Sequence, residues 1–183
     1  MSGATQSAVI VTVPPAEDAV ARHRTRFDRA AGWGVPAHVT VLFPFLPPAD
    51  LDDRVVATLA AAVASVPGFA ASWESTGWFG SDVLWLAPRP AECFRALTTA
   101  VVDAFPGYPP YGGEHPVVVP HLTVGHAAAA EDELREAERQ VRAQLPIGMD
   151  VTAAALWCGT DAPGSWREVA ALPLGTRPRD SQP

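Results

Sequence analysis

Two short segments each place a histidine and a threonine two residues apart inside an apolar run. The first is His38-Val39-Thr40-Val41 and the second is His121-Leu122-Thr123-Val124. Because side chains alternate along a β-strand, the histidine and threonine of each segment point to one face and the aliphatic residues to the other. We therefore expect the aliphatic face to pack under helices and the polar face to line a cleft.

The reaction that suits this arrangement is displacement at phosphorus, in which the entering and leaving oxygens lie roughly in line. A base is needed on one side and an acid on the other, so His38 and His121 are expected to face each other from separate strands. With a pKa near ~6.5, one imidazole can be neutral and the other protonated near neutral pH. Thr40 and Thr123 are predicted to donate their hydroxyls to non-bridging phosphate oxygens. This chemistry requires no metal.

Either segment alone would be ambiguous, because a strand threonine is commonly structural and a half-buried histidine is often a hydrogen-bonded structural group. Composition alone predicts roughly a third of one H-x-T segment in this chain. The flanks also match, since a Val-Pro pair stands shortly before each histidine, at Val35-Pro36 and Val119-Pro120. A zinc site is disfavoured because no further ligands have suitable spacing. A Ser-His-Asp site is disfavoured because no G-x-S-x-G segment occurs.

The bulk composition limits the partners. The chain has 183 residues, 48% of them hydrophobic, and a net charge of −7, with no lysine. This charge disfavours extended nucleic-acid binding but permits a small phosphorylated ligand. Cys93 and Cys158 have no metal or redox spacing, and no apolar run is long enough to span a membrane. The N-terminal segment has no charged region before its short apolar run, which argues against a secretory signal. We expect a cytoplasmic monomer, and the arginine-only basic residues suggest a GC-rich bacterial source.

Helical and strand patterns alternate along the chain. Strands are predicted over residues 7–13, 37–43, 69–79, 83–87, 117–125, 150–157 and 167–172. Helices are predicted over residues 14–32, 50–65, 91–104 and 131–145. Several connections are short enough for hairpins, so an α+β sandwich with antiparallel or mixed sheets is favoured over a parallel fold. Residues 1–183 are predicted to form one domain of two lobes, with a loose tail over 175–183.

On these two segments and their flanks, "GVPAHVTVLFPF" and "VVPHLTVG", the chain resembles the two-histidine (2H) phosphoesterase superfamily, in its LigT or 2′-5′ RNA ligase-like branch. The resemblance implies a bilobed, pseudo-twofold α+β fold with a central cleft and helices outside. It also implies metal-independent, cofactor-free hydrolysis of 2′,3′-cyclic phosphates on RNA ends or small nucleotides. The family's acid/base pair falls on His38 and His121, and its phosphate-binding pair on Thr40 and Thr123.

Five other residues are weaker candidates for the functional site. On a regular strand, His126 would face away from His121, and it is interpreted as a structural or surface residue. His23, in the Arg-rich "RHRTR" segment, is interpreted as solvated, and His115 as an incidental loop residue. Tyr111 and Phe45 are near enough to the two segments to stack on a base or ribose.

Two other functional classes remain open. One is a non-catalytic nucleotide-binding module of the same fold, although binding alone does not require two titrating imidazoles. The other is an RNA-end ligase or exonuclease. The second class predicts a basic groove, and the absence of lysine, with Gly125-His126 where many relatives have a basic residue, argues against it.

Overall fold

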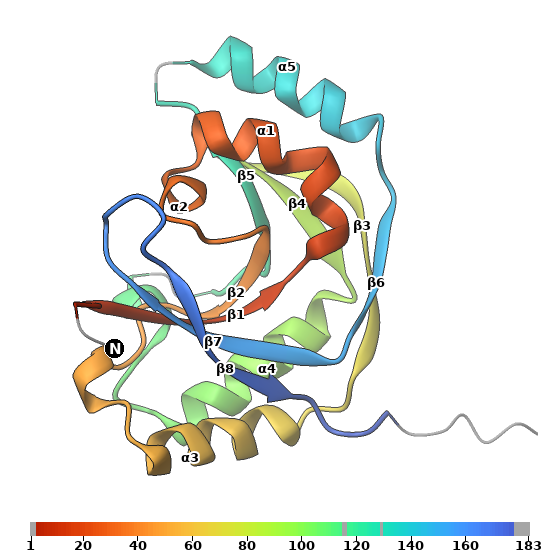
Figure 1. The fold of residues 1–183 in the computed structure, drawn as a ribbon. Coiled ribbons are helices and arrows are strands. Elements are labelled where there is room, and N and C mark those ends of the chain that lie inside the picture. Colours follow the sequence, from red (N-terminus) through yellow and green to blue (C-terminus); the bar gives the residue numbers. More distant parts are fainter. Residues whose placement is uncertain (1–2, 115–116, 129, 178–183) are drawn as a thin grey trace, which may run out of the picture.

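The computed structural model of the protein describes residues 3–114, 117–128 and 130–177. Its eight strands form two antiparallel four-stranded sheets (Figure 1). The first sheet has the order β2-β1-β7-β8 and consists of β1 (Gln6–Thr12), β2 (His38–Leu42), β7 (Ala153–Gly159) and β8 (Arg167–Pro173). The second has the order β5-β4-β3-β6 and consists of β3 (Phe69–Phe79), β4 (Val83–Arg89), β5 (Leu122–His126) and β6 (Ile147–Val151).

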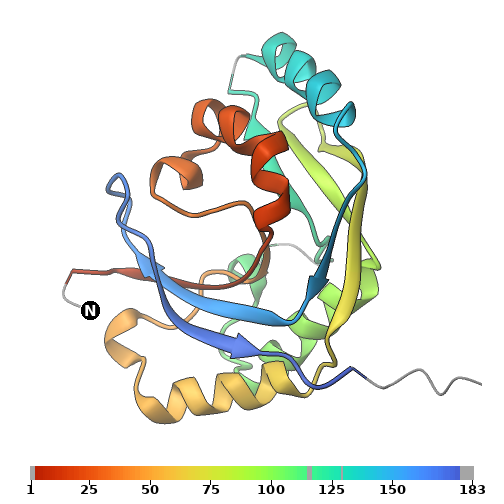
Figure 2. The same ribbon diagram turned by 45° about the vertical axis from the view of Figure 1, so that its right-hand side comes forward.

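The helices lie outside the two sheets. In the described residues they are α1 (Glu17–Phe27), α2 (Arg29–Gly32), α3 (Asp53–Ala64), α4 (Ala91–Ala104) and α5 (Glu131–Arg142). Helices α3 and α4 contact β8 and β2 of the first sheet, whereas α1 and α5 contact β5 and β3 of the second. Figures 1 and 2 show α1 and α5 together at the top and α3 and α4 in the lower part. The predicted bilobed α+β fold is confirmed.

Local sequence explains why these helices form where they do. Helix α3 begins after Asp52, whose carboxylate accepts a hydrogen bond from the Val55 backbone N–H at 2.7 Å. Helix α5 has acidic residues in its first turn and arginines in its last, which complements the helix dipole. In α4, Phe94, Leu97 and Val101 recur on one face and are almost fully buried. This apolar face attaches the helix to the core.

The two strands that carry the paired segments are edge strands, and each is supported by a helix of the other half of the sequence. On β2, the Val41 carbonyl accepts a hydrogen bond from the Thr98 hydroxyl of α4 at 3.0 Å. On β5, Gly125 lets α1 approach closely, because a Cβ there would lie 2.4 Å from the Cβ of Phe27. Strands β2 and β5 also contact each other. The fold therefore brings the two segments together between the sheets.

Most predicted elements differ from the observed ones by a few residues at their ends, and three differ more substantially. The helix predicted over 14–32 divides at Asp28, whose carboxylate accepts from the Ala30 backbone N–H at 3.0 Å and starts α2. The strand predicted over 117–125 begins only at Leu122. The strand predicted over 150–157 is two strands, because the chain leaves β6 of the second sheet and enters β7 of the first at Thr152. An alternating pattern carries no sign of such a change of sheet.

The C-terminal segment is attached to the body of the protein as far as Gly175. Its backbone N–H donates to the Val66 carbonyl at 2.8 Å, and its carbonyl accepts from the Gly68 N–H at 2.8 Å. The remainder of the predicted tail, from residue 178, lies outside the described residues. Among the helices of the described ranges, none has the length and apolar character needed to cross a bilayer.

Candidate active site

The alternation predicted for the two segments is present. The polar residues His38, Thr40, His121 and Thr123 are half-buried, whereas Val39, Val41, Leu122 and Val124 are buried. The aliphatic face of each segment therefore belongs to the core. The histidine and threonine face is the one that borders open space.

Each histidine ring is held by the same backbone contact. The Nδ1 of His38 lies 2.7 Å from the Pro36 carbonyl oxygen, and the Nδ1 of His121 lies 2.7 Å from the Val119 carbonyl oxygen. A carbonyl can only accept a hydrogen bond, so Nδ1 carries the hydrogen in both rings. Nε2 is then the nitrogen that can take up or release a proton. In both segments the acceptor stands two residues before the histidine.

The two rings lie close enough for the charge of His121 to affect the pKa of His38. Burial, with smaller contributions from the nearby Arg24 guanidinium and the His121 ring, lowers the pKa of His38 from 6.5 to about 4. Burial also lowers the pKa of His121, and the hydrogen bond to the Val119 carbonyl opposes this shift. Both rings are therefore mostly neutral near pH 7 when no anion lies between them.

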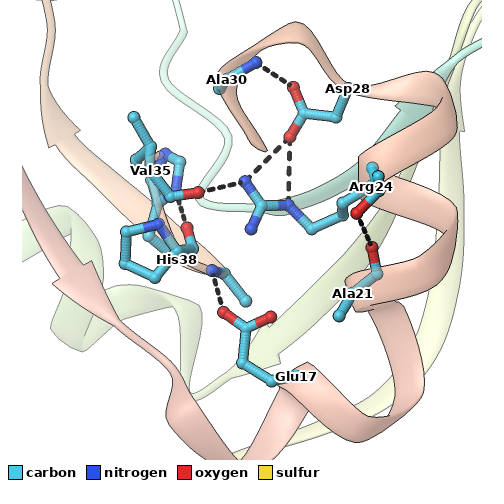
Figure 3. A network of polar contacts seen from close by, with 10 residues as sticks. Glu17, Ala21, Arg24, Asp28, Ala30, Val35 and His38 are labelled. Atoms are coloured by element: carbon cyan, nitrogen blue, oxygen red, sulfur yellow. Dashed lines mark hydrogen bonds and ion pairs between the residues drawn. The ribbon is translucent and has the colours of Figure 1, made fainter. Parts of the chain in front are cut away.

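A buried polar network fixes the backbone that leads into His38 (Figure 3). Arg24 donates to Asp28 through Nε at 3.1 Å and through Nη2 at 2.9 Å. The same Nη2 donates to the Val35 carbonyl at 3.1 Å. The Glu17 carboxylate accepts from the Ala37 backbone N–H at 2.6 Å. Helix α1 thus holds the chain on both sides of Pro36, whose carbonyl orients the His38 ring.

The sequence does not reveal this network, and the interpretation of His23 as solvated is wrong, because its side chain is only 6% exposed. The neighbouring Arg24, in the same basic segment, is only 2% exposed. The available signal was the spacing of Arg24 and Asp28, which puts them on one helix face. Charge alone did not distinguish this pair from an exposed one.

Hollows of different size open beside the two segments. One, of about 110 Å³, is lined by His38 and Thr40 together with Trp33, Phe43 and Trp166 among others. The other, of about 470 Å³, is lined by Phe79, Val83, Tyr111, Val117, Val119, His121, Thr123 and His126. We call them the His38 hollow and the His121 hollow. A larger open groove of about 680 Å³ runs along β3 and β4 near Arg89, away from both histidines.

Tyr111 links the two segments. Its side chain is hydrogen-bonded to Thr40 and lines the His121 hollow, so it bridges the two lobes. Its backbone N–H donates to the Phe43 carbonyl at 2.7 Å. Its φ of +53° lies in the left-handed region, which is strained for a residue with a side chain. The hydrogen bond of its side chain, the hydrogen bond of its backbone and its left-handed φ together make Tyr111 a further candidate site residue.

The other weaker candidates from the sequence lie in different surroundings. His126 is exposed, as expected, but it lines the His121 hollow rather than facing away. The register of β5 against β4 shifts between Leu84 and Trp85. This irregularity reverses the in-and-out alternation of side chains along β5, so His126 comes to the same side as His121. Phe45 is a core residue, packed against Phe105 at 5.0 Å between ring centroids. His115 lies outside the described residues.

A metal or cofactor is not suggested by the side chains that surround the histidines. Within the residues that the structure describes, no group of three or more His, Cys, Asp or Glu side chains could hold a metal ion. The two hollows beside the histidines are lined by aromatic and aliphatic side chains with the histidines and threonines as their polar groups, and their described linings contain no arginine. Among the described residues that line these hollows, the imidazoles are the groups that can become cations beside a phosphate.

Comparisons with known proteins agree with this fold. The family model of the 2′-5′ RNA ligase superfamily matches residues 12–161. E. coli LigT in apo form superposes with a TM-score of 0.58 at 18% identity, covering 96% of this chain and 100% of that one. LigT complexed with 3′-AMP gives 0.56 at 18%, covering 94% and 99%. A Thermus thermophilus protein gives 0.57 at 16%, again covering 94% and 99%. A search of curated protein sequences gave no match.

Proposed function

The chain belongs to the 2′-5′ RNA ligase superfamily, and from this premise we propose that it is a metal-independent phosphodiesterase that hydrolyses 2′,3′-cyclic phosphates. The family supports a phosphoesterase or ligase-like role. The substrates we propose are nucleotides or RNA ends that carry the cyclic ester. E. coli LigT has been crystallised with 3′-AMP and with phosphate, which supports a small nucleotide as the ligand class.

One observation carries the proposal. Both histidines are held through Nδ1 by a backbone carbonyl, and both therefore present Nε2 for proton transfer. A binding site has no need to fix two neutral imidazoles in the same tautomer, whereas acid/base catalysis does. The paired threonines on the same faces supply hydroxyl donors for the phosphate oxygens.

The reaction follows from these groups. One Nε2 accepts a proton from water as the water oxygen attacks phosphorus, and the other Nε2 protonates the ribose oxygen that departs. The diester anion raises the pKa of a nearby imidazole, so binding of the substrate itself produces the protonated acid. Thr40 and Thr123 donate to the non-bridging oxygens, where negative charge builds up in the transition state. The product is a phosphomonoester with a new ribose hydroxyl.

The test is turnover of a panel of nucleoside 2′,3′-cyclic phosphates in the presence of EDTA. We expect His38→Ala and His121→Ala each to lower kcat by about 10²–10⁴. Thr40→Val and Thr123→Val are expected to lower kcat/KM by roughly 10-fold through a lost hydrogen bond. Thr58→Val, on the exposed face of α3, is the matched control and is expected to match the wild type.

Four results would contradict the proposal. Full activity in both histidine variants would remove the assigned roles, and loss of activity with EDTA would indicate a metal enzyme. Binding of 3′-AMP with no turnover of any cyclic ester would indicate a nucleotide-binding module instead. Joining of RNA ends in place of hydrolysis would indicate the ligase class.

A further inference from the structure

The two residues Val35 and Pro36, which lead toward His38, have every backbone hydrogen-bonding group in use. The Val35 N–H donates to the Ala30 carbonyl at 3.0 Å, and the Val35 carbonyl accepts from Arg24 at 3.1 Å. Pro36 has no N–H, and its carbonyl accepts from Nδ1 of His38 at 2.7 Å. The carbonyl that orients the ring therefore belongs to a segment whose position is fixed from several sides.

The next residue, Ala37, ties this segment to α1 through one carboxylate. The Ala37 backbone N–H donates to Oε1 of Glu17 at 2.6 Å, and the Ala37 carbonyl accepts from the Val13 N–H at 2.8 Å. Glu17 is the first residue of α1 and is half-buried. Figure 3 shows Glu17 and Arg24 reaching the segment from the same helix.

The contact to Glu17 and the contact to His38 are made by a single peptide unit. The carbonyl of Pro36 and the N–H of Ala37 flank one trans peptide bond, and a peptide unit is planar. Its N–H and its carbonyl point to opposite sides. A carboxylate that fixes the direction of the N–H therefore also fixes the direction of the carbonyl, and Glu17 and His38 bind the two ends of one rigid group.

The charge of the carboxylate strengthens the contact at the far end of this peptide unit. An anion that accepts from an N–H polarises the peptide, and the carbonyl oxygen becomes a better acceptor. The hydrogen on Nδ1 of His38 is then held more firmly, which leaves Nε2 for proton transfer. Burial lowers the pKa of His38, and the hydrogen bond to the Pro36 carbonyl opposes this shift.

His121 cannot be held in the same way. Its Nδ1 donates to the Val119 carbonyl, and the nitrogen of that peptide unit belongs to Pro120, which has no N–H. The Val-Pro pair stands one residue further from His38 than from His121, and this offset places Ala37, with its N–H, directly after the proline. Both rings have a carbonyl contact, but only the one at His38 belongs to a peptide unit that a carboxylate can bind.

We propose that Glu17 is a positioning residue, which acts through the peptide unit between Pro36 and Ala37 to hold the His38 ring with the hydrogen on Nδ1. Its effect on the rate rests on the proposed function, whereas its effect on the ring does not. A carboxylate in the first turn of a helix also stabilises the helix dipole. Asp18 has the same charge in the same turn of α1 but is exposed, which makes it the matched control.

The effect on the ring is tested without turnover, by ¹⁵N NMR of the histidine rings of the full-length protein near neutral pH. In the wild type, His38 and His121 are both expected to carry the hydrogen on Nδ1. In Glu17→Ala, the His38 ring is expected to shift toward the form with the hydrogen on Nε2, while His121 stays unchanged and serves as an internal control. Asp18→Asn is expected to leave both rings as they are in the wild type.

The effect on the rate is tested with nucleoside 2′,3′-cyclic phosphates. Glu17→Ala is expected to lower kcat by roughly 10- to 100-fold and to change KM by about 2-fold or less, because the ring is misplaced but the substrate contacts remain. Glu17→Gln keeps a side-chain oxygen that can accept from the Ala37 N–H, and its kcat is expected to lie within about 5-fold of the wild type. Asp18→Asn should match the wild type in both constants.

The positioning role is wrong if the His38 ring is unchanged in Glu17→Ala, whatever the rate. An equal change in both rings would indicate a general loosening of the fold and would also overturn it. A shifted His38 ring with an unchanged kcat would refute the effect on the rate. Should Glu17→Ala fail to fold, Glu17→Met keeps the length of the side chain without an acceptor and replaces it. A wild type that hydrolyses no cyclic ester would refute the proposed function, and a shift confined to the His38 ring would still establish that Glu17 holds it.

Discussion

The buried ion pair behind His38 makes a quantitative prediction about stability. The side chains of Arg24 and Asp28 are 3% and 5% exposed, and the guanidinium makes three hydrogen bonds within the network. Asp28→Asn keeps the shape and the oxygen that caps α2 but removes the negative charge. The arginine then stays buried without a counterion, which costs about 3–5 kcal/mol.

This loss is large for a domain whose unfolding free energy is roughly 5–15 kcal/mol. For a chain of this length it corresponds to a fall in Tm of roughly 6–20 °C. Urea denaturation followed by tryptophan fluorescence measures it, with the expectation that the midpoint shifts and the m-value is unchanged. A double variant, Arg24→Met with Asp28→Asn, carries no buried charge and is expected to recover more than half of the loss.

Helix α5 offers a matched control. Arg135 and Glu131 have the same spacing of four residues and an N···O distance of 3.2 Å, but their side chains are 41% and 51% exposed. Glu131→Gln is expected to change stability by about 0.5 kcal/mol or less. If Asp28→Asn destabilised the protein no more than Glu131→Gln does, burial would not be what makes the first pair matter, and the reasoning would be refuted.

Three further predictions follow from the site and its supports. The folded pKa of His38, about 4, lies below the unfolded value of 6.5, so its contribution to stability is complete above pH 6.5 and is lost as the pH falls toward 4. Wild type should lose on the order of 3 kcal/mol more than His38→Gln over this range, measured by urea denaturation at several pH values. Tyr111→Phe is expected to raise KM for cyclic nucleotides by roughly 2- to 10-fold, because Thr40 loses its hydrogen-bond partner; an unchanged KM would exclude that role. Gly125→Ala should destabilise the protein by about 1–3 kcal/mol through overpacking against α1, whereas Gly148→Ala, with its nearest contact at 3.8 Å, should not.

Much of the site was predictable because it depends on short-range rules. Alternation along a strand placed His38 with Thr40 and His121 with Thr123 on common faces, and the structure has these faces. The repeated Val-Pro flank also had a physical basis, since the carbonyls that orient the rings belong to Pro36 and Val119. The reactions assigned to the four residues stay a prediction.

What the sequence could not show depends on long-range packing or on a single irregular residue. Arg24 looks like any surface arginine until α1 packs against the chain before His38. The change of sheet at Thr152 leaves no periodic trace. His126 lines the His121 hollow only because the ladder between β4 and β5 is irregular, and no composition rule locates such an irregularity.

The position of β2 and β5 has a consequence for how ligands enter and leave. Each is the outermost strand of its own sheet in the described part of the chain. The two sheets are held together instead by one continuous core and by the packing of α1 on β5. Because parting of the sheets would expose that core, a ligand enters and leaves through the mouths of the two hollows, beside the contact between Tyr111 and Thr40.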